Sequence, residues 1–385
     1  MKNKKILFIV NHLAFFVSHR MCIADELIKR NNKIKIISGN SASILMEKIA
    51  IREMKKKKID YEKLSYSSSK INFFKDIIGI LKLVFIIKRF QPDIIHFVSA
   101  KGFLVGIISS YFSKVKHKLV SISGIGNFFI DKKIRSKIIK FFYIRFILFF
   151  KNENNKFIVQ NTRDQNLIIK YFKLQKKNVF LFKGSGVDIS KINSSKLKQR
   201  KNIVLFPARA VLEKGLMEFI AASNFLKKKF PNWKFIIAGT LDYKGPGQIN
   251  KIELNSLKNN KNLIFAGYQK NLNKLLKISS IVCLPSYNEG LSKSLIEALF
   301  MKIPIITTNV PGCKELVKNH KTGFLVPPKN IFLLTKKLEK LMQDKKMRAD
   351  MMYNYKSFNL NIYEKNTIII KHLKLYNSFF KNDKI

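Results

Sequence analysis

The chain has 385 residues, 46% of them hydrophobic, which is enough for two domains with separate cores and argues against a disordered chain. Its 74 lysine and arginine residues outnumber 24 acidic ones, giving a formal charge of +50. AT-rich coding sequence alone can produce such a lysine-rich composition. The functional interpretations are nucleic acid, an anionic membrane surface or phosphorylated substrates as partners.

The beginning of the chain resembles a signal peptide, since lysines precede the apolar run Ile6–Val10. This run is short, however, and no small-residue cleavage site follows, so we expect a first β-strand. No stretch reaches 18 uncharged apolar residues, and no transmembrane helix is expected. Three widely spaced cysteines (Cys22, Cys283 and Cys313) indicate a reduced, cytosolic chain without disulfides or structural zinc.

Short apolar segments alternate with longer amphipathic ones, a pattern typical of βαβ units on parallel sheets. The strands expected in the first half are Ile6–Val10, Lys33–Ser38, Asp93–Val98, Leu119–Ser123, Phe157–Gln160 and Val179–Phe182. The polar, lysine-rich stretch Ser190–Asn202 is then interpreted as an interdomain linker.

A second series of strands follows this linker. Its expected members are Ile203–Phe206, Phe235–Ala238, Leu263–Ala266, Ile281–Leu284, Ile305–Thr307 and Gly323–Val326. Helical segments such as Leu216–Lys229, Leu272–Ile278 and Ser292–Met301 separate them, and a terminal helical stretch runs from about residue 330 to 380.

The predicted fold class is therefore α/β, with two doubly wound, Rossmann-like domains in tandem. The domains are expected at residues 1–189 and 203–355, joined by the linker 190–202. A C-terminal helical segment, 356–385, can pack back on the first domain.

Two segments of the first domain, Phe73–Phe90 and Ile138–Lys151, are dense in Phe and Ile with scattered Lys and Arg. One interpretation is buried helices whose basic side chains reach out to water. The other is a hydrophobic and basic surface that enters a membrane interface, where each lysine near anionic lipid adds about 1 kcal/mol. The sequence leaves both interpretations open.

Residues 285–298 carry the most functional information. The buried strand Ile281–Leu284 is expected to lead into a loop with Glu289 and Gly290 and then a helix with Glu297. A carboxylate at the carboxyl end of a strand, beside glycine and the first amides of a helix, suits a phosphorylated, hydroxyl-rich ligand. Eight residues of helix rise roughly 12 Å, whereas paired glycosidase carboxylates lie about 5–9.5 Å apart. The two acids are therefore expected to contact different parts of one long ligand.

Two cations follow the first strand of the second series. Arg209 and Lys214 come after Ile203–Phe206, and Gly215 opens the next helix. Two cations and a helix N-terminus at the carboxyl edge of a strand form a diphosphate site. The pattern alone is weak, because many loops carry such charges, but the acids of the same domain strengthen it.

Together these motifs resemble those of the bacterial family 4 glycosyltransferases. The matching residues of the second half are Arg209, Lys214-Gly215, Gly239, Tyr287-Asn-Glu289-Gly290-Leu291, Glu297, Val310-Pro-Gly312 and Gly323-Phe-Leu-Val-Pro327. Those of the first half are Ser18-His19-Arg20, Ser123-Gly-Ile-Gly126, Gln160-Asn161 and Gly184-Ser-Gly-Val-Asp188. The resemblance implies the GT-B fold, in which two Rossmann-like domains face each other across a cleft, and a retaining mechanism. It is strongest for the branch that adds a hexosamine, often N-acetylgalactosamine, to an undecaprenyl-diphosphate-linked sugar.

The resemblance also implies a role for each matching residue. Arg209 and Lys214 would neutralise the donor diphosphate, and Glu289 would hydrogen-bond to sugar hydroxyls. Glu297 would bind the ribose, and Tyr268 the base. The other expected donor contacts are Gly239, Asn288, Gly290 and Leu291. The loop Asn11–Arg20 would form the wall of the cleft near the acceptor, which makes Asn11, Ser18, His19 and Arg20 acceptor candidates. Gly124 and Gly126, on a separate loop that could line the cleft, are the other acceptor candidates.

One loop departs from the family pattern. Many family 4 enzymes carry a histidine after the strand that corresponds to Leu119–Ser123, whereas here the loop is Ser123-Gly-Ile-Gly-Asn127. A backbone amide could substitute for the missing side chain. His12 and His19 are the nearest alternatives, although a lone histidine is more often structural.

The leading hypothesis is an enzyme that moves a hexose or N-acetylhexosamine from a UDP-sugar to an undecaprenyl-diphosphate-linked saccharide. It would lie peripherally on the cytoplasmic face of the plasma membrane, bound to an anionic membrane surface. A UDP-hexosamine 2-epimerase of the same architecture is the alternative, but it would need acid/base carboxylates that the first domain does not offer at its strand ends. A nucleic-acid-binding protein is a distant alternative, because the lysines are dispersed and no aromatic-basic recognition module is present.

No metal-binding cluster is visible in the sequence, and no cofactor besides the UDP-sugar co-substrate is expected. Arg209 and Lys214 can supply the positive charge that Mg²⁺ often supplies to a diphosphate. Metal-independent activity is therefore predicted.

Overall fold

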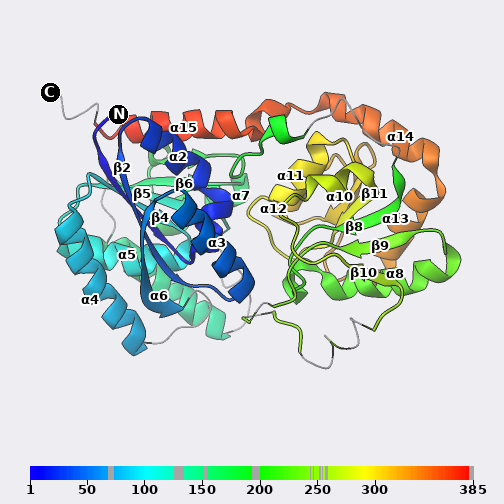
Figure 1. Cartoon of the computed structure of the whole chain (residues 1–385), viewed down its shortest axis with the longest axis horizontal. Helices are drawn as coiled ribbons and strands as arrows, with labels where there is room; N and C mark the ends of the chain where they lie inside the picture. Colours follow the sequence, from blue (N-terminus) through cyan, green and yellow to red (C-terminus); the bar gives the residue numbers. More distant parts are fainter. Residues whose placement is uncertain are drawn as a thin grey trace. The chain divides into compact units, whose positions relative to one another are not determined.

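The chain folds into two compact units, each built on one parallel β-sheet (Figure 1). The computed structural model describes residues 1–67, 73–124, 134–150, 154–192 and 200–380, apart from 243, 246, 251, 252, 254 and 256–258. Unit 1 consists of Met1–Gly186 and Lys365–Ile385, and unit 2 of Val187–Glu364. The predicted class of two doubly wound α/β domains is confirmed.

The boundaries of the units follow burial rather than polarity. Val187 and Ile192 are already buried in the core of unit 2, so the chain joins that unit before the linker 190–202 that polarity suggested. Tyr363 is also buried there, and the chain returns to unit 1 only after Glu364 rather than at 356. The backbone N–H of Val187 donates to the carbonyl of Tyr363 (3.0 Å), so the two crossing segments lie side by side. Residues 193–199 of the expected linker lie outside the described residues.

Unit 1 contains a seven-stranded sheet in the order β3-β2-β1-β4-β5-β6-β7, with all neighbouring strands parallel. The strands are β1 (Lys5–Val10), β2 (Lys33–Asn40), β3 (Asp60–Ser67), β4 (Ile94–Val98), β5 (His117–Ile122), β6 (Lys156–Val159) and β7 (Val179–Leu181). The sheet reverses its direction of growth between β1 and β4, which are neighbours although four helices and two strands separate them in the chain.

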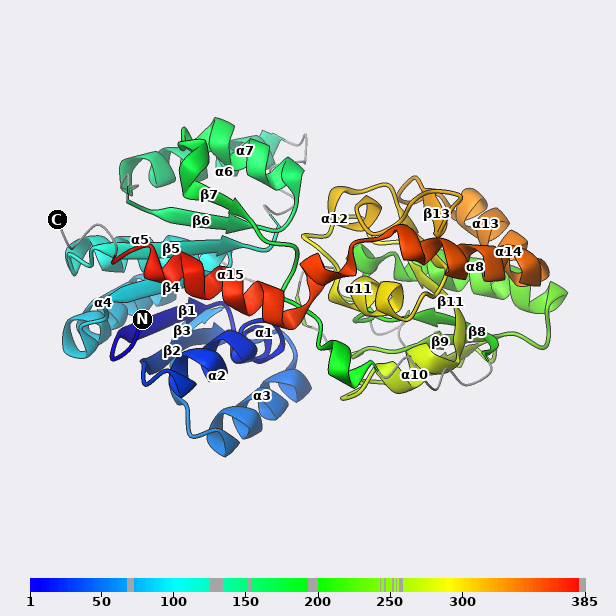
Figure 2. The same cartoon turned by 90° about the horizontal axis from the view of Figure 1, so that it is seen from above.

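Both faces of this sheet are covered. Side chains alternate along β1, so that Phe8 and Ile6 belong to one hydrophobic core and Leu7 and Ile9 to another. The helices packed on the Phe8 face are α1 (Leu13–His19), α2 (Met21–Lys29), α3 (Ile44–Lys56) and α15 (Lys365–Asn377), with α15 beside α2 (Figure 2). The helices on the Leu7 face are α4 (Phe73–Phe90), α5 (Ala100–Phe112), α6 (Ile134–Phe150) and α7 (Thr162–Phe172).

The edge strand β3 is missing from the strands predicted from sequence. Its residues Asp60 and Glu62 are charged, and Lys35 on β2 pairs with both across the solvated edge (3.1 and 3.6 Å). An edge strand needs few apolar residues because only part of it is buried. The apolar pattern that marks the central strands is therefore absent from β3.

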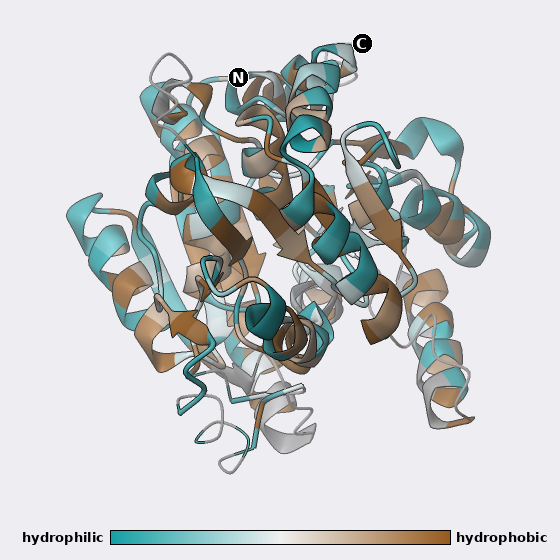
Figure 3. Ribbon diagram, turned by 90° about the vertical axis from the view of Figure 1, so that its right-hand side faces the viewer, coloured by the Kyte–Doolittle hydropathy of each residue, from teal (hydrophilic) through white to brown (hydrophobic). Residues whose placement is uncertain are grey.

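Unit 2 contains a six-stranded parallel sheet in the order β10-β9-β8-β11-β12-β13. The strands are β8 (Lys201–Phe206), β9 (Lys234–Ile237), β10 (Leu263–Phe265), β11 (Ser279–Leu284), β12 (Ile305–Thr308) and β13 (Gly323–Val326). The described helices are α8 (Leu216–Lys229), α10 (Asn273–Ile278), α11 (Lys293–Phe300), α12 (Pro311–Lys314), α13 (Ile331–Gln343) and α14 (Lys345–Asn354). The central strands are largely brown in Figure 3, because strands covered on both faces are apolar along most of their length.

Candidate active site

The candidate site lies in unit 2 where the direction of the sheet changes. β8 and β11 are adjacent strands, but the chain leaves β8 towards β9 and leaves β11 towards β12. The loops after the two strands therefore run in opposite directions at the carboxyl edge of the sheet, which is where open α/β sheets bind ligands. Arg209 and Lys214 are on the loop after β8, and Glu289 is on the loop after β11.

Backbone contacts hold these two loops together. The N–H of Tyr287 donates to the carbonyl of Glu213 (2.9 Å), and the Ser286 hydroxyl donates to the same carbonyl (3.1 Å). Gly215 has a left-handed backbone (φ 74°), and a Cβ there would lie 2.0 Å from the carbonyl oxygen of Pro285. Only glycine fits at this position. Gly215 thus allows the loop that carries Arg209 and Lys214 to pack closely against the loop that carries Glu289.

An ion pair joins Lys214 to Glu289 at this junction. The Lys214 Nζ lies 2.5 Å from Glu289 Oε1, and the side chains are 21% and 11% exposed. A partly buried pair is screened less by salt than a surface pair and holds the ammonium in one place. Arg209 precedes Lys214 on the same loop and is exposed. Two of the three predicted catalytic residues are therefore in direct contact.

The Glu289 loop rests on the segment after β12. A Cβ on Gly312 would lie 2.4 Å from the carbonyl oxygens of Glu289 and Gly290. The Thr308 hydroxyl donates to the carbonyl of Ser286 from the same side. Gly290 and Leu291, the next residues of the loop, are buried, and the carbonyl of Asn288 accepts from the Ser286 hydroxyl (3.2 Å).

A buried acid that the sequence did not single out supports this loop. The hydroxyl of Tyr287 donates to Glu218 Oε1 on α8 (2.5 Å), and Glu218 itself is buried. Burial and the neighbouring Glu218 carboxylate raise the pKa of Tyr287 above its usual value. The pair ties the loop after β11 to the helix after β8. An acid in the first turn of a helix is common, so its pattern in the sequence carries no signal for this role.

Glu297 lies on α11, the helix that follows the Glu289 loop. Its side chain is partly buried, and this burial raises the pKa of the carboxyl above the usual value. Ser292 is the N-cap of α11 but makes no side-chain capping bond. The predicted helix 292–301 matches α11 to within a residue at each end.

The remaining donor candidates come from the loops after β9 and β10. A Cβ on Gly239 would lie 1.9 Å from the carbonyl oxygen of Ala208, so the loop after β9 packs against the backbone of the Arg209 loop. Tyr268 follows β10 and is 37% exposed. Because β10 is two strands away from β8, Tyr268 is the outlying member of the predicted set.

In unit 1, Asn11 occupies the equivalent switch point between β1 and β4. Its Oδ1 accepts from the hydroxyl of Ser99 and from the N–H of Gly102 (3.1 Å). Ser99 follows β4 with φ 100°, an unusual conformation for a serine, and was missed in the sequence. Asn11 therefore joins the ends of the two central strands. Gly124 has φ 124° after β5, whereas Gly126 lies outside the described residues.

The segment expected as the loop Asn11–Arg20 is mostly helix α1. His12 caps this helix, since its Nδ1 accepts from the N–H of Phe15 (3.1 Å). The ring of His19 stacks on Phe15 (4.3 Å between centroids), and its Nδ1 lies 2.5 Å from the Ser18 hydroxyl. Both histidines thus have structural partners within the helix.

Arg20 differs most from its expected place on the wall of a cleft. It is only 1% exposed and lies in the core near His96, His372 and Tyr376, where burial lowers its pKa. His96 bridges Tyr376 of α15 and Ser121 of β5 (2.7 Å each). The residue pattern does not distinguish a surface arginine from one buried in this way, because the covering helix comes from the other end of the chain.

Within the described part of the chain, no group of three or more His, Cys, Asp or Glu side chains could hold a metal ion. None of the three cysteines forms a disulfide. Burial raises the pKa of the Cys313 thiol to about 12, so this cysteine near Glu289 stays protonated.

Each of the two units matches a family model of glycosyl transferases. The model of glycosyl transferase 4-like proteins matches residues 5–161, and that of glycosyl transferases group 1 matches residues 188–358. A Campylobacter jejuni relative, N,N'-diacetylbacillosaminyl-diphospho-undecaprenol alpha-1,3-N-acetylgalactosaminyltransferase, is 26% identical, with 97% of this chain and 98% of the relative covered. A Staphylococcus aureus capsular polysaccharide biosynthesis glycosyltransferase is 23% identical over 99% of both chains.

Solved structures show the same fold. The crystal structure of Anabaena HepE in complex with UDP-glucose aligns with a TM-score of 0.74 at 16% identity, covering 98% of this chain and 100% of that one. A glycosyltransferase from Rickettsia africae aligns with a TM-score of 0.73 at 19% identity over 99% of both chains. The chain is therefore a glycosyltransferase of the GT-B fold, with a 4-like first unit and a group 1 second unit.

Proposed function

We propose that the enzyme transfers a hexose or N-acetylhexosamine from a UDP-sugar with retention of the anomeric configuration. The observation that carries this proposal is the Lys214–Glu289 pair at the switch point between β8 and β11. Lys214 and Glu289 lie 2.5 Å apart there, and we assign neutralisation of the diphosphate to the cation and hydrogen bonding with sugar hydroxyls to the carboxylate. In the proposed reaction the cation and the carboxylate must both lie within a few ångströms of the glycosidic oxygen, because this atom joins the sugar to the diphosphate.

In the proposed reaction the bond between the anomeric carbon and the UDP oxygen breaks, and a bond to an acceptor hydroxyl forms on the same face of the sugar. Negative charge grows on the departing diphosphate, whose oxygen takes up the proton that the acceptor hydroxyl loses. Arg209 and Lys214 stabilise the growing charge, which is the larger requirement because a diphosphate leaves without a general acid. Glu289 holds the sugar through its hydroxyls, and Glu297 accepts from the ribose.

We propose an undecaprenyl-diphosphate-linked saccharide as the acceptor. The Campylobacter jejuni relative bears such an acceptor in its name, as does an Escherichia coli relative named UDP-Gal:alpha-D-GlcNAc-diphosphoundecaprenol alpha-1,3-galactosyltransferase. The latter is 25% identical, with 71% of this chain and 73% of the relative covered. A polyprenyl acceptor stays in the bilayer, so the enzyme must reach a membrane surface.

One side of unit 1 is suited to that surface. More than half of the large apolar side chains that are exposed in the described residues lie on α4, α5 and α6. Nine of them define what we call the apolar face: Ile77, Ile78, Leu81, Phe85, Phe112, Ile134, Ile138, Phe141 and Phe142. Exposed basic residues accompany them, namely Lys82, Lys88, Arg89, Lys137 and Arg145.

Of the two interpretations that the sequence left open for these helices, exposure favours the membrane interface. Leu81 and Phe85 are 65% and 66% exposed and stand one helical turn apart, so they are not core residues. None of the described helices is long and apolar enough to cross a membrane. We propose peripheral attachment to an anionic membrane through the apolar face, on the cytoplasmic side, where the acceptor would be extended.

The assignment of Glu289 can be tested with a matched pair of variants. Glu289→Gln keeps the size of the side chain but loses its charge, and Glu339→Gln does the same for the surface pair of Glu339 with Lys229 on α8. Transfer from a UDP-sugar to a polyprenyl-diphosphate saccharide should fall about 10²–10³-fold only in Glu289→Gln. Equal activity of the two folded variants would contradict the proposal.

A further inference from the structure

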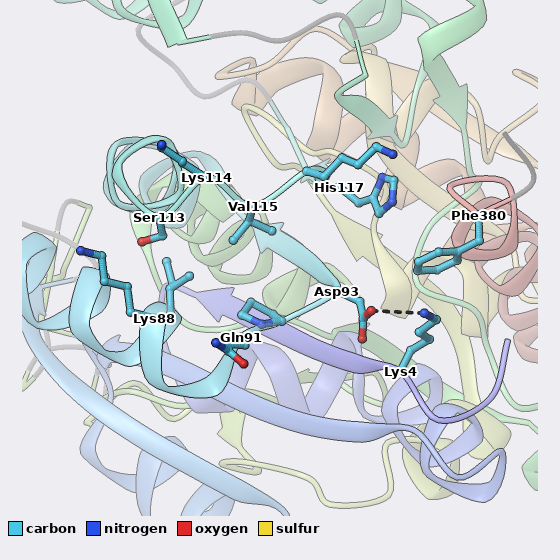
Figure 4. A pocket seen from close by; sticks show the side chains of 12 residues that line it. Lys4, Lys88, Gln91, Asp93, Ser113, Lys114, Val115, His117 and Phe380 are labelled. Carbon is cyan, nitrogen blue, oxygen red and sulfur yellow. Dashed lines mark hydrogen bonds and ion pairs between the residues drawn. The ribbon is translucent and has the colours of Figure 1, made fainter. Parts of the chain in front are cut away.

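A hollow of about 660 Å³ lies in unit 1 at the edge of the sheet where the strands begin (Figure 4). Lys4 precedes β1, Asp93 precedes β4, and His117 opens β5, while Lys88 comes from the last turn of α4. Asn11 is at the other end of β1, so the hollow is at the opposite edge of the sheet from the switch point. It takes no part in the proposed transfer reaction.

The hollow is strongly basic. The basic side chains that line it are Lys4, Lys88, Lys114, Lys116 and His117. The acid among the lining residues is Asp93, which accepts from the N–H of Lys5 (2.8 Å) and from Lys4 Nζ (3.3 Å) and so is already neutralised. Lys88 and Lys114 are exposed on one side of the hollow, opposite Lys4 and Phe380 (Figure 4). A ligand that fits this lining carries negative charge.

The hollow also adjoins the apolar face. Ile78, Leu81, Phe85 and Lys88 follow one another at intervals of three or four residues on α4, so they share one side of the helix. Lys88 therefore continues the apolar stripe into the hollow. On α5, exposed Phe112 directly precedes Ser113 and Lys114 of the lining. The α4 and α5 helices pack against each other, which brings the two apolar-to-basic borders together.

We propose that the hollow binds the phosphate of an anionic phospholipid while the apolar face contacts the acyl region of the same bilayer. This inference rests on the proposed attachment of unit 1 to a membrane. Lysine ammonium groups bind a phosphodiester as point charges, and basic pockets beside an apolar surface bind lipid head groups in this manner. A zwitterionic head group carries its own cation and would meet the lysines with repulsion.

Lysines near the end of a helix also stabilise its dipole, and this effect must be separated from ligand binding. Lys55 and Lys56 provide the matched control. They are exposed and occupy the last turn of α3, as Lys88 does for α4, but α3 covers the opposite face of the sheet. Lys88→Gln with Lys114→Gln and Lys55→Gln with Lys56→Gln thus remove the same charge from two sides of unit 1.

The test is calorimetric titration of the full chain with short-chain phosphatidylglycerol below its micelle concentration. The wild type and the α3 pair should bind it saturably, and the Lys88/Lys114 pair should bind it roughly 30-fold more weakly. Short-chain phosphatidylcholine and inorganic phosphate should bind more weakly than phosphatidylglycerol. Equal affinities of the two variant pairs, or equal affinities for the two lipids, would overturn the proposal. Inorganic phosphate that binds as tightly as the lipid would assign the hollow to a soluble anion instead.

Two further readouts separate this inference from the proposed function. Leu81→Ser with Phe85→Ser should release the enzyme from vesicles that contain phosphatidylglycerol, yet keep its affinity for the short-chain lipid. The Lys88/Lys114 pair should keep wild-type transfer to a water-soluble acceptor. Absence of transfer by the wild type would contradict the proposed function alone, whereas undiminished lipid binding by the Lys88/Lys114 pair contradicts the inference alone.

Discussion

Gly312→Ala tests whether the position of the Glu289 loop sets the rate of transfer. A Cβ at residue 312 would lie 2.4 Å from the carbonyl oxygens of Glu289 and Gly290, whereas ordinary van der Waals contact begins at 3.4 Å. The loop must therefore retreat by about 1 Å, and such a misplacement of a catalytic group costs about 10²-fold in rate. This is about 2.7 kcal/mol of transition-state stabilisation.

The assay compares kcat/KM for transfer with the melting temperature of the same preparation. Gly323→Ala is the control, since its Cβ would lie 1.9 Å from the carbonyl oxygen of Ile305, at the beginning of β12 and β13 and thus at the edge opposite Glu289. It should lower stability but leave kcat of the folded enzyme unchanged. Wild-type kcat/KM in folded Gly312→Ala would refute the reasoning.

Four other predictions follow from the site and from the core of unit 1. Arg209→Ala and Lys214→Ala should each lower kcat about 10²–10³-fold, because each removes one positive charge that stabilises the diphosphate. A wild-type kcat in either variant would show that the replaced residue has no role in the reaction. Burial raises the pKa of the Glu297 carboxyl above its usual value of 4.5, so on acidification this group becomes protonated while the pH is still above 4.5. The KM for the UDP-sugar should rise over the same pH range, and Glu297→Gln should abolish this pH dependence. Transfer should persist in excess chelator because the two cations provide the charge, and complete loss that only Mg²⁺ or Mn²⁺ restores would contradict this prediction. Burial lowers the pKa of His372 from 6.5 to about 3, so the folded chain binds fewer protons than the unfolded chain below 6.5 and stability is lost as the pH falls. The free energy of unfolding should drop by about 1.4 kcal/mol from this group between about pH 7.5 and about pH 5.5, as measured by urea titration, and the drop should be smaller in His372→Asn.

The sequence predicts the parts of the fold that depend on local pattern. Continuous apolar runs identify the central strands such as β11 and β12, and amphipathic spacing identifies α8 with its bounds at Leu216–Lys229. The cations after β8 and the acid after β11 could be expected to meet, because the carboxyl ends of adjacent parallel strands share one edge. Their direct contact through Lys214 and Glu289 follows from that topology.

Features that depend on distant segments were not predictable in this way. Arg20 is buried because α15 returns from the end of the chain to cover it, and nothing near Arg20 in the sequence indicates this. Glu218 and Ser99 act through single hydrogen bonds to Tyr287 and Asn11, for which no spacing rule exists. The boundaries of the units were misplaced for the same reason, since burial of Tyr363 rather than local polarity decides where unit 2 ends.

The most direct test of the account is the product itself. The wild-type enzyme is incubated with a panel of UDP-hexoses and UDP-N-acetylhexosamines and an undecaprenyl-diphosphate-linked saccharide in vesicles that contain phosphatidylglycerol. Mass spectrometry and NMR then identify the sugar added and its linkage. We predict addition of one sugar with the anomeric configuration of the donor. Folded enzyme that transfers from none of the UDP-sugars, or that inverts the configuration, would contradict the account.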